Sequence, residues 1–170
     1  MKRISIDIES LSLAHNALVL SIGAVVFCPQ TGLGREYYVV LNGKEQSKRD
    51  IDFSTVQWWI RLAQESPVAA DLFAATPQSV PQALSDLAQF ISPEDEVWAR
   101  GPQFDIVALE SLYREHGMRP PWDYSMVRDQ RTYCAGQPAV PFVGTAHNAL
   151  ADAKHQARAI MNVMIATGVE

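Results

Sequence analysis

The alternation of apolar and polar residues predicts three β-strands in the first part of the chain. Isoleucine at every second position predicts a strand over Lys2–Glu9. A strongly apolar stretch predicts the second strand, Ala17–Cys28, and the aromatic and branched residues at 37–40 predict the third, Arg35–Leu41. The turn residues of Pro29–Gly34 join them, so we expect these two strands to pair in antiparallel fashion. The polar segment Asn42–Asp52 is expected to be an exposed loop.

In the remainder of the chain, apolar residues recur at helical spacing. The expected helices run from Ser54 or Thr55 to about Gln64, from Ser79 to about Ile91, from about Gln103 to His116, and from about Asn148 to Ala166. A short strand is expected at Val97–Ala99, and another near Ser125–Val127 with a short helix after it. A meander followed by helices and further strands predicts one α/β domain over residues 1–170, with a mixed central β-sheet flanked by helices.

Two acidic residues on the first strand are the most informative local feature. Asp7 and Glu9 are two positions apart, so both side chains lie on one face of that strand, roughly 7 Å from each other. Two like charges on a core strand repel each other. A bound cation between them would offset that repulsion.

Three later residues supply further candidates for the same site. Asp105 lies near the start of a helix and on its apolar face, although a first-turn aspartate also fits ordinary helix capping. Asp152 borders the apolar stripe of the last helix. His147 precedes Asp152 by five residues, so the two can act together only if His147 lies at or before the helix start. A capping or surface histidine is the alternative.

Composition narrows the function classes. The net charge of −5 argues against a protein that coats long nucleic acids electrostatically. It does not exclude an enzyme that handles one strand end. No apolar run is long enough for a membrane span, and Cys28 and Cys134 lack zinc-site spacing, so we expect reduced thiols and a cytoplasmic protein without a membrane partner.

Three motifs in order carry a resemblance to a known family. Asp7-x-Glu9, Phe104-Asp105 and His147-x4-Asp152 resemble the DEDDh 3′–5′ exonucleases of the ribonuclease H-like fold. The resemblance covers essentially the whole chain. Thr55–Trp59 and Trp98–Asp105 are similar to a branch of stand-alone phage and bacterial exonucleases that has RNase AS as a relative.

The resemblance implies a metal-dependent 3′–5′ exonuclease that acts on the 3′ ends of single-stranded DNA or RNA and releases nucleoside 5′-monophosphates. Asp7, Glu9, Asp105 and Asp152 would hold two Mg²⁺ or Mn²⁺ ions, and His147 would be the general base. Ribonuclease T and RNase AS form pairs, so a homodimer is a further expectation. The sugar of the substrate is left open.

Residues beside these motifs are candidates for substrate binding. Ser10 and Leu11 follow the acidic pair, and Leu11 is expected to act as an apolar wedge. Phe104 is a candidate for stacking on a base, with a core position as the alternative. Arg100 is a candidate for phosphate binding, with a structural ion pair as the alternative. Trp58 and Trp59 point in different directions on a helix, so one is expected in the core and the other in a substrate groove or an oligomer interface.

Two other functions remain open at this point. The chain can be a catalytically silent subunit that binds nucleic-acid ends on the same fold, or a structural protein with incidental acidic residues. His15, His116 and His155 lack acidic neighbours at useful spacing and are expected on the surface.

Overall fold

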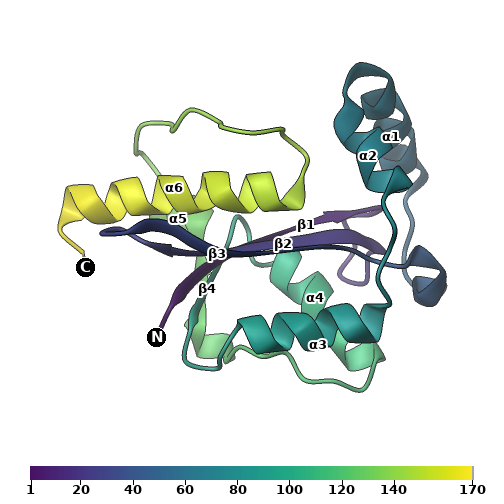
Figure 1. Ribbon diagram of the computed structural model, residues 1–170, viewed down its shortest axis with the longest axis horizontal. Helices are drawn as coiled ribbons and strands as arrows, with labels where there is room; N and C mark the ends of the chain where they lie inside the picture. Colours follow the sequence, from purple (N-terminus) through teal and green to yellow (C-terminus); the bar gives the residue numbers. More distant parts are fainter. Residues whose placement is uncertain (170) are drawn as a thin grey trace.

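A mixed β-sheet forms the centre of the computed structural model, which describes residues 1–169 (Figure 1). Within these residues the sheet has five strands in the order β3-β2-β1-β4-β5. The strands are β1 (Arg3–Ser10), β2 (Val19–Cys28), β3 (Gly32–Val40), β4 (Glu96–Ala99) and β5 (Val127–Asp129). The first three strands pair in antiparallel fashion, whereas β4 and β5 run parallel to β1. The mixed sheet expected from the sequence is confirmed.

Helices cover both faces of this sheet and one of its ends. The long helix α6 (Ala149–Thr167) lies on one face, and α3 (Val80–Phe90) and α4 (Asp105–Glu115) lie on the other (Figure 1). Two further helices, α1 (Phe53–Glu65) and α2 (Pro67–Ala74), lie together beyond one end of the sheet. Short helical segments are η1 (Gly43–Gln46), η2 (Tyr124–Met126) and α5 (Gln130–Tyr133). None of the helices in residues 1–169 combines the length and apolar character needed to cross a bilayer.

The isoleucines of β1 decide which face of that strand carries the acidic residues. Ile6 is fully buried in a cluster that includes Leu84 of α3 and Leu109 of α4. Because successive side chains of a strand point to opposite faces, Asp7 and Glu9 point to the other face, which α6 covers. The alternation seen in the sequence therefore places both carboxylates under α6.

A glycine in β2 lets the start of α6 come unusually close to the sheet. Gly23 pairs with Asp7 across the β1–β2 ladder. A Cβ atom built on Gly23 would lie 2.2 Å from the main-chain carbon of Ala149, the first residue of α6. Only a residue without a side chain fits there, and the close approach brings Asp152 down towards Asp7.

Three local expectations differ from the structure, and one helix was not expected. Asn42–Asp52 is not simply exposed, because Gln46 and Arg49 within it are buried. The side chain of Asp52, and not Ser54 or Thr55, caps α1 by accepting a hydrogen bond from the Ser54 main-chain N–H at 3.1 Å.

The helix α2 was not expected at all. The last strand lies at Val127–Asp129, two residues later than the expected position, and the segment Tyr124–Met126 before it is a 3-10 turn. These differences leave the order of layers unchanged.

We expect Gly23→Ala to lower the free energy of unfolding by about 1–3 kcal/mol or more, because the new methyl group would force α6 away from the sheet. Thermal unfolding measures the change. Gly34→Ala is the matched control in the neighbouring strand, since its Cβ would meet Val26 only at an ordinary distance of 3.5 Å. Equal stability of the two variants would contradict the close approach of α6.

Candidate active site

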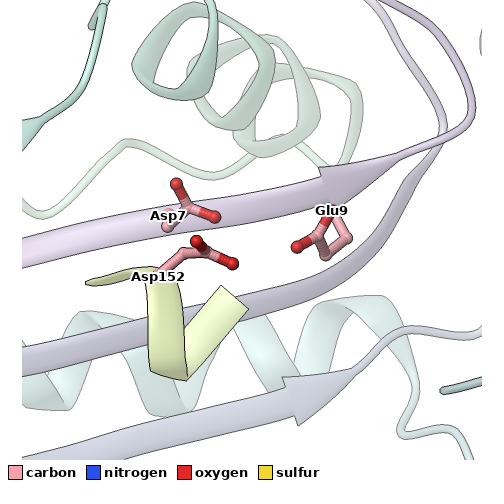
Figure 2. A group of neighbouring side chains, drawn as sticks. All are labelled: Asp7, Glu9 and Asp152. Atoms are coloured by element: carbon pink, nitrogen blue, oxygen red, sulfur yellow. The ribbon is translucent and has the colours of Figure 1, made fainter. Parts of the chain in front are cut away.

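Three carboxylates from two elements converge beneath the start of α6. Asp7 and Glu9 extend from β1, and Asp152 extends from the first turn of α6 towards them (Figure 2). One oxygen of each group lies within 4.8 Å of the others. This spacing is suited to a shared cation with oxygen ligands, such as Mg²⁺ or Mn²⁺.

Asp105 approaches the same site from the opposite layer. It is the first residue of α4 and is only 6% exposed. The main chain of Ile8 hydrogen-bonds to its carboxylate, and its charge raises the pKa of both Asp7 and Glu9. The structure therefore brings all four acidic residues expected from the sequence into one electrostatically linked group.

Burial raises the pKa of each of these acids, and the charges of acidic neighbours raise those of Asp7 and Glu9 further. Burial is the largest cause for Glu9, and the charges of Asp152 and Asp105 add to it, raising its pKa to about 8. Burial raises the pKa of Asp105 to about 7. The pKa of Asp7 is well above its usual range because of burial and its three acidic neighbours, and burial also raises that of Asp152. Such shifts show that the site stabilises fewer negative charges than it contains.

The hydrogen bonding of Asp152 and Asp7 leaves oxygens that could bind a cation. Asp152 Oδ2 is buried and, among the described residues, has no hydrogen-bond partner. One oxygen of Asp7 accepts a hydrogen bond of 2.7 Å from Gln156 Nε2, which leaves its other oxygen for a further interaction. The site offers only oxygen atoms as metal ligands, and one of them lacks a hydrogen bond. Both features suit a hard divalent ion.

Gln156 was not identified from the sequence. It lies four residues after Asp152, on the same side of α6, and this spacing was the available signal. Its amide group has no acidic or basic character, so nothing in its chemistry distinguishes it from a packing residue. Its hydrogen bond lowers the pKa of Asp7 and orients that carboxylate.

His147 lies before the start of α6, as the spacing requires. Its φ of 64° is in the left-handed region, where only a few per cent of non-glycine residues are found. The next residue, Asn148, caps the helix by accepting a hydrogen bond of 3.1 Å from the main-chain N–H of Ala151. The imidazole meets Trp58 of α1 edge to face, with ring centroids 4.8 Å apart.

A pocket of about 360 Å³ opens beside Glu9, at the end of β1. It is lined by Ile8, Glu9, Ser10, Leu13, Ser54, Thr55, Trp58, Trp59 and Phe104. Trp59 is only 2% exposed and donates a hydrogen bond of 2.9 Å from Nε1 to the carbonyl of Ser10, whereas Trp58 is 40% exposed. One tryptophan therefore fixes α1 to the end of β1, and the other presents its ring to both the pocket and His147.

The other expected substrate-binding residues lie in different surroundings. Phe104 is half-buried against the core and also lines the pocket. Leu11 lies outside this pocket and packs against the apolar cluster of α1 and α2. Leu13, which the sequence did not single out, lines the pocket and is 80% exposed.

His155 is not the simple surface residue that was expected. It is half-buried and packs against Phe142, with ring centroids 4.8 Å apart. Burial lowers its pKa, and the charge of Asp152, one turn earlier on α6, raises it. Arg100 is exposed, and its positive charge lowers the pKa of the same histidine. Arg100 makes none of the ion pairs found within residues 1–169.

The raised pKa of Glu9 makes the stability of the metal-free protein depend on pH. The ordinary pKa of 4.5 applies to the unfolded chain, and the folded value is about 8. Between these values the folded protein holds a proton that the unfolded chain has lost, so the free energy of unfolding falls as the pH rises. The loss is complete above pH 8, and no loss occurs below pH 4.5.

We expect Glu9→Gln to raise Tm in EDTA at pH 8, by about 2–4 °C for each kcal/mol of repulsion removed. The same variant should lose most of the increase in Tm that Mg²⁺ or Mn²⁺ gives the unmodified protein. Thermal unfolding from pH 5 to 9 measures both effects, with exposed Glu94→Gln as the control. A lower Tm for Glu9→Gln than for the unmodified protein in EDTA would contradict the repulsion described above.

Solved structures with the same fold are nucleases. The nuclease domain of 3′hExo, a DEDDh family member bound to rAMP, is 14% identical, with a TM-score of 0.65 over 99% of this chain and 94% of that chain. Pop2p of S. pombe, in an Mg²⁺- and Mn²⁺-bound form, is 10% identical, with a TM-score of 0.68 over 98% and 84%. Exonuclease I of E. coli with a dT13 oligonucleotide is 12% identical, with a TM-score of 0.58 over 99% of this chain but 40% of that chain. These similarities establish the ribonuclease H-like fold of DEDDh nucleases.

A family model assigns the chain more narrowly. The model of the Rv2179c-like 3′–5′ exoribonuclease domain matches residues 2–164. The comparison with curated proteins found no match. Because the family match includes every acidic residue of the site and His147, the chain belongs to the Rv2179c-like 3′–5′ exoribonuclease domain family and is a 3′–5′ exonuclease.

Proposed function

We propose that this protein removes nucleotides one at a time from the 3′ end of single-stranded nucleic acid, using divalent metal ions and releasing nucleoside 5′-monophosphates. The observation that carries this proposal is the convergence of Asp7, Glu9 and Asp152, whose oxygens lie within 4.8 Å of one another. The exonuclease family of the chain supplies the reaction type. The homodimer expected from the sequence stays a prediction.

The four carboxylates would divide between two metal sites. Asp7, Glu9 and Asp152 would hold one ion, since their oxygens already lie together. Asp105 would hold the second together with Asp7, because its charge acts on Asp7 from the α4 side. Bound there, the ions would supply positive charge that stabilises the developing negative charge on the scissile phosphate. Pop2p, which has the same fold, binds Mg²⁺ and Mn²⁺.

His147 is suited to accept a proton from the attacking water. It is exposed, it stands directly before α6, and its charge lowers the pKa of Asp152, so the two side chains are close. Histidine is the side chain that most often acts as a general base in enzymes. Contact with Trp58 limits the rotation of the imidazole.

The pocket beside Glu9 would receive the terminal nucleoside. Its volume of about 360 Å³ is within the range of small-molecule sites. The exposed ring of Trp58 and the edge of Phe104 provide aromatic surface for a base. Ser10 and the exposed Leu13 lie at the same opening. The Ser10 hydroxyl donates to the Ser12 carbonyl at 2.7 Å, so its oxygen remains able to accept a hydrogen bond from the substrate.

RNA is the substrate that we favour. The family is described as a 3′–5′ exoribonuclease domain, and 3′hExo was solved with rAMP. Exonuclease I, which has the same fold, binds a DNA oligonucleotide, so the fold accommodates both sugars. Digestion of matched 5′-labelled single-stranded RNA, poly(A)-tailed RNA and DNA, with Mg²⁺ and with EDTA, distinguishes the substrates.

We expect Asp7→Asn and Asp152→Asn each to lower nucleotide release by at least about 10²-fold, because each removes a charge that holds the metal. The amides keep the shape of the side chains, so Tm in EDTA should not fall. Thin-layer separation of released 5′-monophosphates measures the loss, and Glu94→Gln is the control. Release by Asp7→Asn at the rate of the unmodified protein would rule out the proposed site.

We expect His147→Ala to lower kcat by about 10²- to 10⁴-fold if the imidazole accepts the proton. Trp58→Leu should also lower kcat in the unmodified protein, since it removes the ring contact at 4.8 Å. In the His147→Ala background, Trp58→Leu should lower kcat no further, because the two residues act together. Phe53→Leu, at an exposed residue of the same helix, is the control. Equal proportional losses in both backgrounds would show that Trp58 does not act through His147.

A further inference from the structure

Three arginines around the site have no ion-pair or hydrogen-bond partner for their side chains in the described part of the chain. Arg100, Arg131 and Arg158 take part in none of the ion pairs, and donate none of the side-chain hydrogen bonds, found within residues 1–169. Other arginines near the sheet, such as Arg49 and Arg128, pair with carboxylates. The three unpaired residues therefore need a separate explanation.

Arg100 lies next to the acidic part of β1. It follows β4 directly, two residues after Trp98. Trp98 pairs with Ser5 in β1, and Ser5 stands two residues before Asp7. The pairing of β4 with β1 ends there, so Arg100, which directly follows β4, extends the chain towards the level of Asp7, and it is exposed.

Arg131 covers the loop that leads into α4. A Cβ built on Gly101 would lie 3.6 Å from Arg131 Nη2, so the guanidinium lies against this glycine. Burial raises the pKa of Asp105, and the charge of Arg131 is among the influences that lower it. Arg131 is exposed, and its influence on the pKa of Asp105 shows that it lies near that carboxylate.

Arg158 lies on α6, near a histidine that Arg100 also influences. It is six residues after Asp152, and its Nη1 atom is buried without a hydrogen-bond partner among the described residues. His155 lies between them on the helix; apart from burial, the positive charges of both Arg100 and Arg158 lower its pKa. Two like charges therefore lie around one histidine, although they repel each other.

An anion would remove this repulsion. The whole chain carries a net charge of −5, so a nucleic-acid strand is repelled by the protein at large and attracted only where positive charge is concentrated. Guanidinium groups bind phosphate oxygens with two parallel hydrogen bonds. We propose that Arg100, Arg131 and Arg158 form a binding surface for the phosphate groups of the nucleotides that precede the scissile bond.

The arginines are not among the residues that line the nucleoside pocket. The pocket is lined by Glu9 and Ser10, at the end of β1. Arg100 directly follows β4, whose pairing with β1 ends at Ser5, and Arg158 lies further along α6 than Gln156, which hydrogen-bonds to Asp7. A strand that enters over the arginines would cross the carboxylates before its last nucleoside reaches the pocket. The inference rests on the proposed exonuclease function.

The test compares Arg100→Gln and Arg158→Gln on two substrates. One is a single-stranded oligonucleotide of ten nucleotides, and the other is the p-nitrophenyl ester of thymidine 5′-monophosphate, which has no upstream phosphate. KM for the oligonucleotide should rise about 3- to 10-fold for each variant, while kcat changes little. The slope of log(kcat/KM) against log[salt] should become shallower by about 0.7 for each phosphate group that the variant no longer binds. The effect should be confined to the long substrate.

Arg119→Gln is the matched control. Arg119 is exposed and follows the end of α4, at the opposite end of that helix from Asp105. It removes the same charge, so a general electrostatic effect would appear in this variant as well. Arg100→Gln and Arg158→Gln variants that match Arg119→Gln in KM and salt slope would overturn the proposal. Equal reductions of kcat/KM on the long and the short substrate would also overturn it, because they would place the arginines at the scissile phosphate.

Failure of the proposed function has a different signature. If the unmodified protein releases nucleotides from neither substrate, the exonuclease assignment fails, and binding of a fluorescently labelled oligonucleotide then tests the surface alone. Anisotropy titrations should still give weaker, less salt-dependent binding for the two arginine variants than for Arg119→Gln. Binding that is the same for all three variants would overturn the surface independently of catalysis.

Discussion

Oxygens of Asp7, Glu9 and Asp152 lie within 4.8 Å of one another; burial raises the pKa of each, and the charges of acidic neighbours raise those of Asp7 and Glu9 further. Without a cation this arrangement costs free energy, so the apolar layers must hold it in place. The isoleucines of β1 pack into the core formed with α3 and α4, and α6 packs on the opposite face against Phe27 and Trp98. The carboxylates thus lie between two hydrophobic clusters, and a cation bound among them would relieve the repulsion.

The carboxylates also meet because α6 lies unusually close to the sheet. The helix reaches the carboxylates because Gly23 has no side chain at the point where Ala149 crosses β2. From this start, Asp152 and Gln156 follow at a spacing of one helical turn, and the amide of Gln156 orients Asp7 at 2.7 Å. A side chain at position 23 would therefore displace α6 and move Asp152 and Gln156 away from Asp7.

The sequence predicted the parts of this structure that depend on local periodicity. The alternating isoleucines identified β1 and the face that carries Asp7, and the motif order identified the four acids. It did not predict the burial of Gln46 and Arg49, because their partners are remote: the Gln46 amide pairs with Val19 at 2.9 and 2.8 Å, and Arg49 donates to the carbonyl of Ala108 at 3.1 Å. The helix α2 was missed because eight residues show too little periodicity. Gly23 looked like an ordinary strand residue, since only the position of α6 gives it a role.

The residues of the site fall into two groups, the carboxylates on rigid elements and the residues on exposed elements around them. The carboxylates stand on β1 and on the first turns of α4 and α6, where main-chain hydrogen bonds and the core fix them. His147, Trp58, Arg100 and Arg131 are exposed, and they lie on the loop before α6, on α1, directly after β4 and on α5. Substitutions in these outer elements would change which substrate binds and how tightly, and they would leave the carboxylates in place. Selectivity for a sugar or a base should therefore vary through α1 and the loop before α6, while the acidic centre and the glycine that admits the helix stay constrained together.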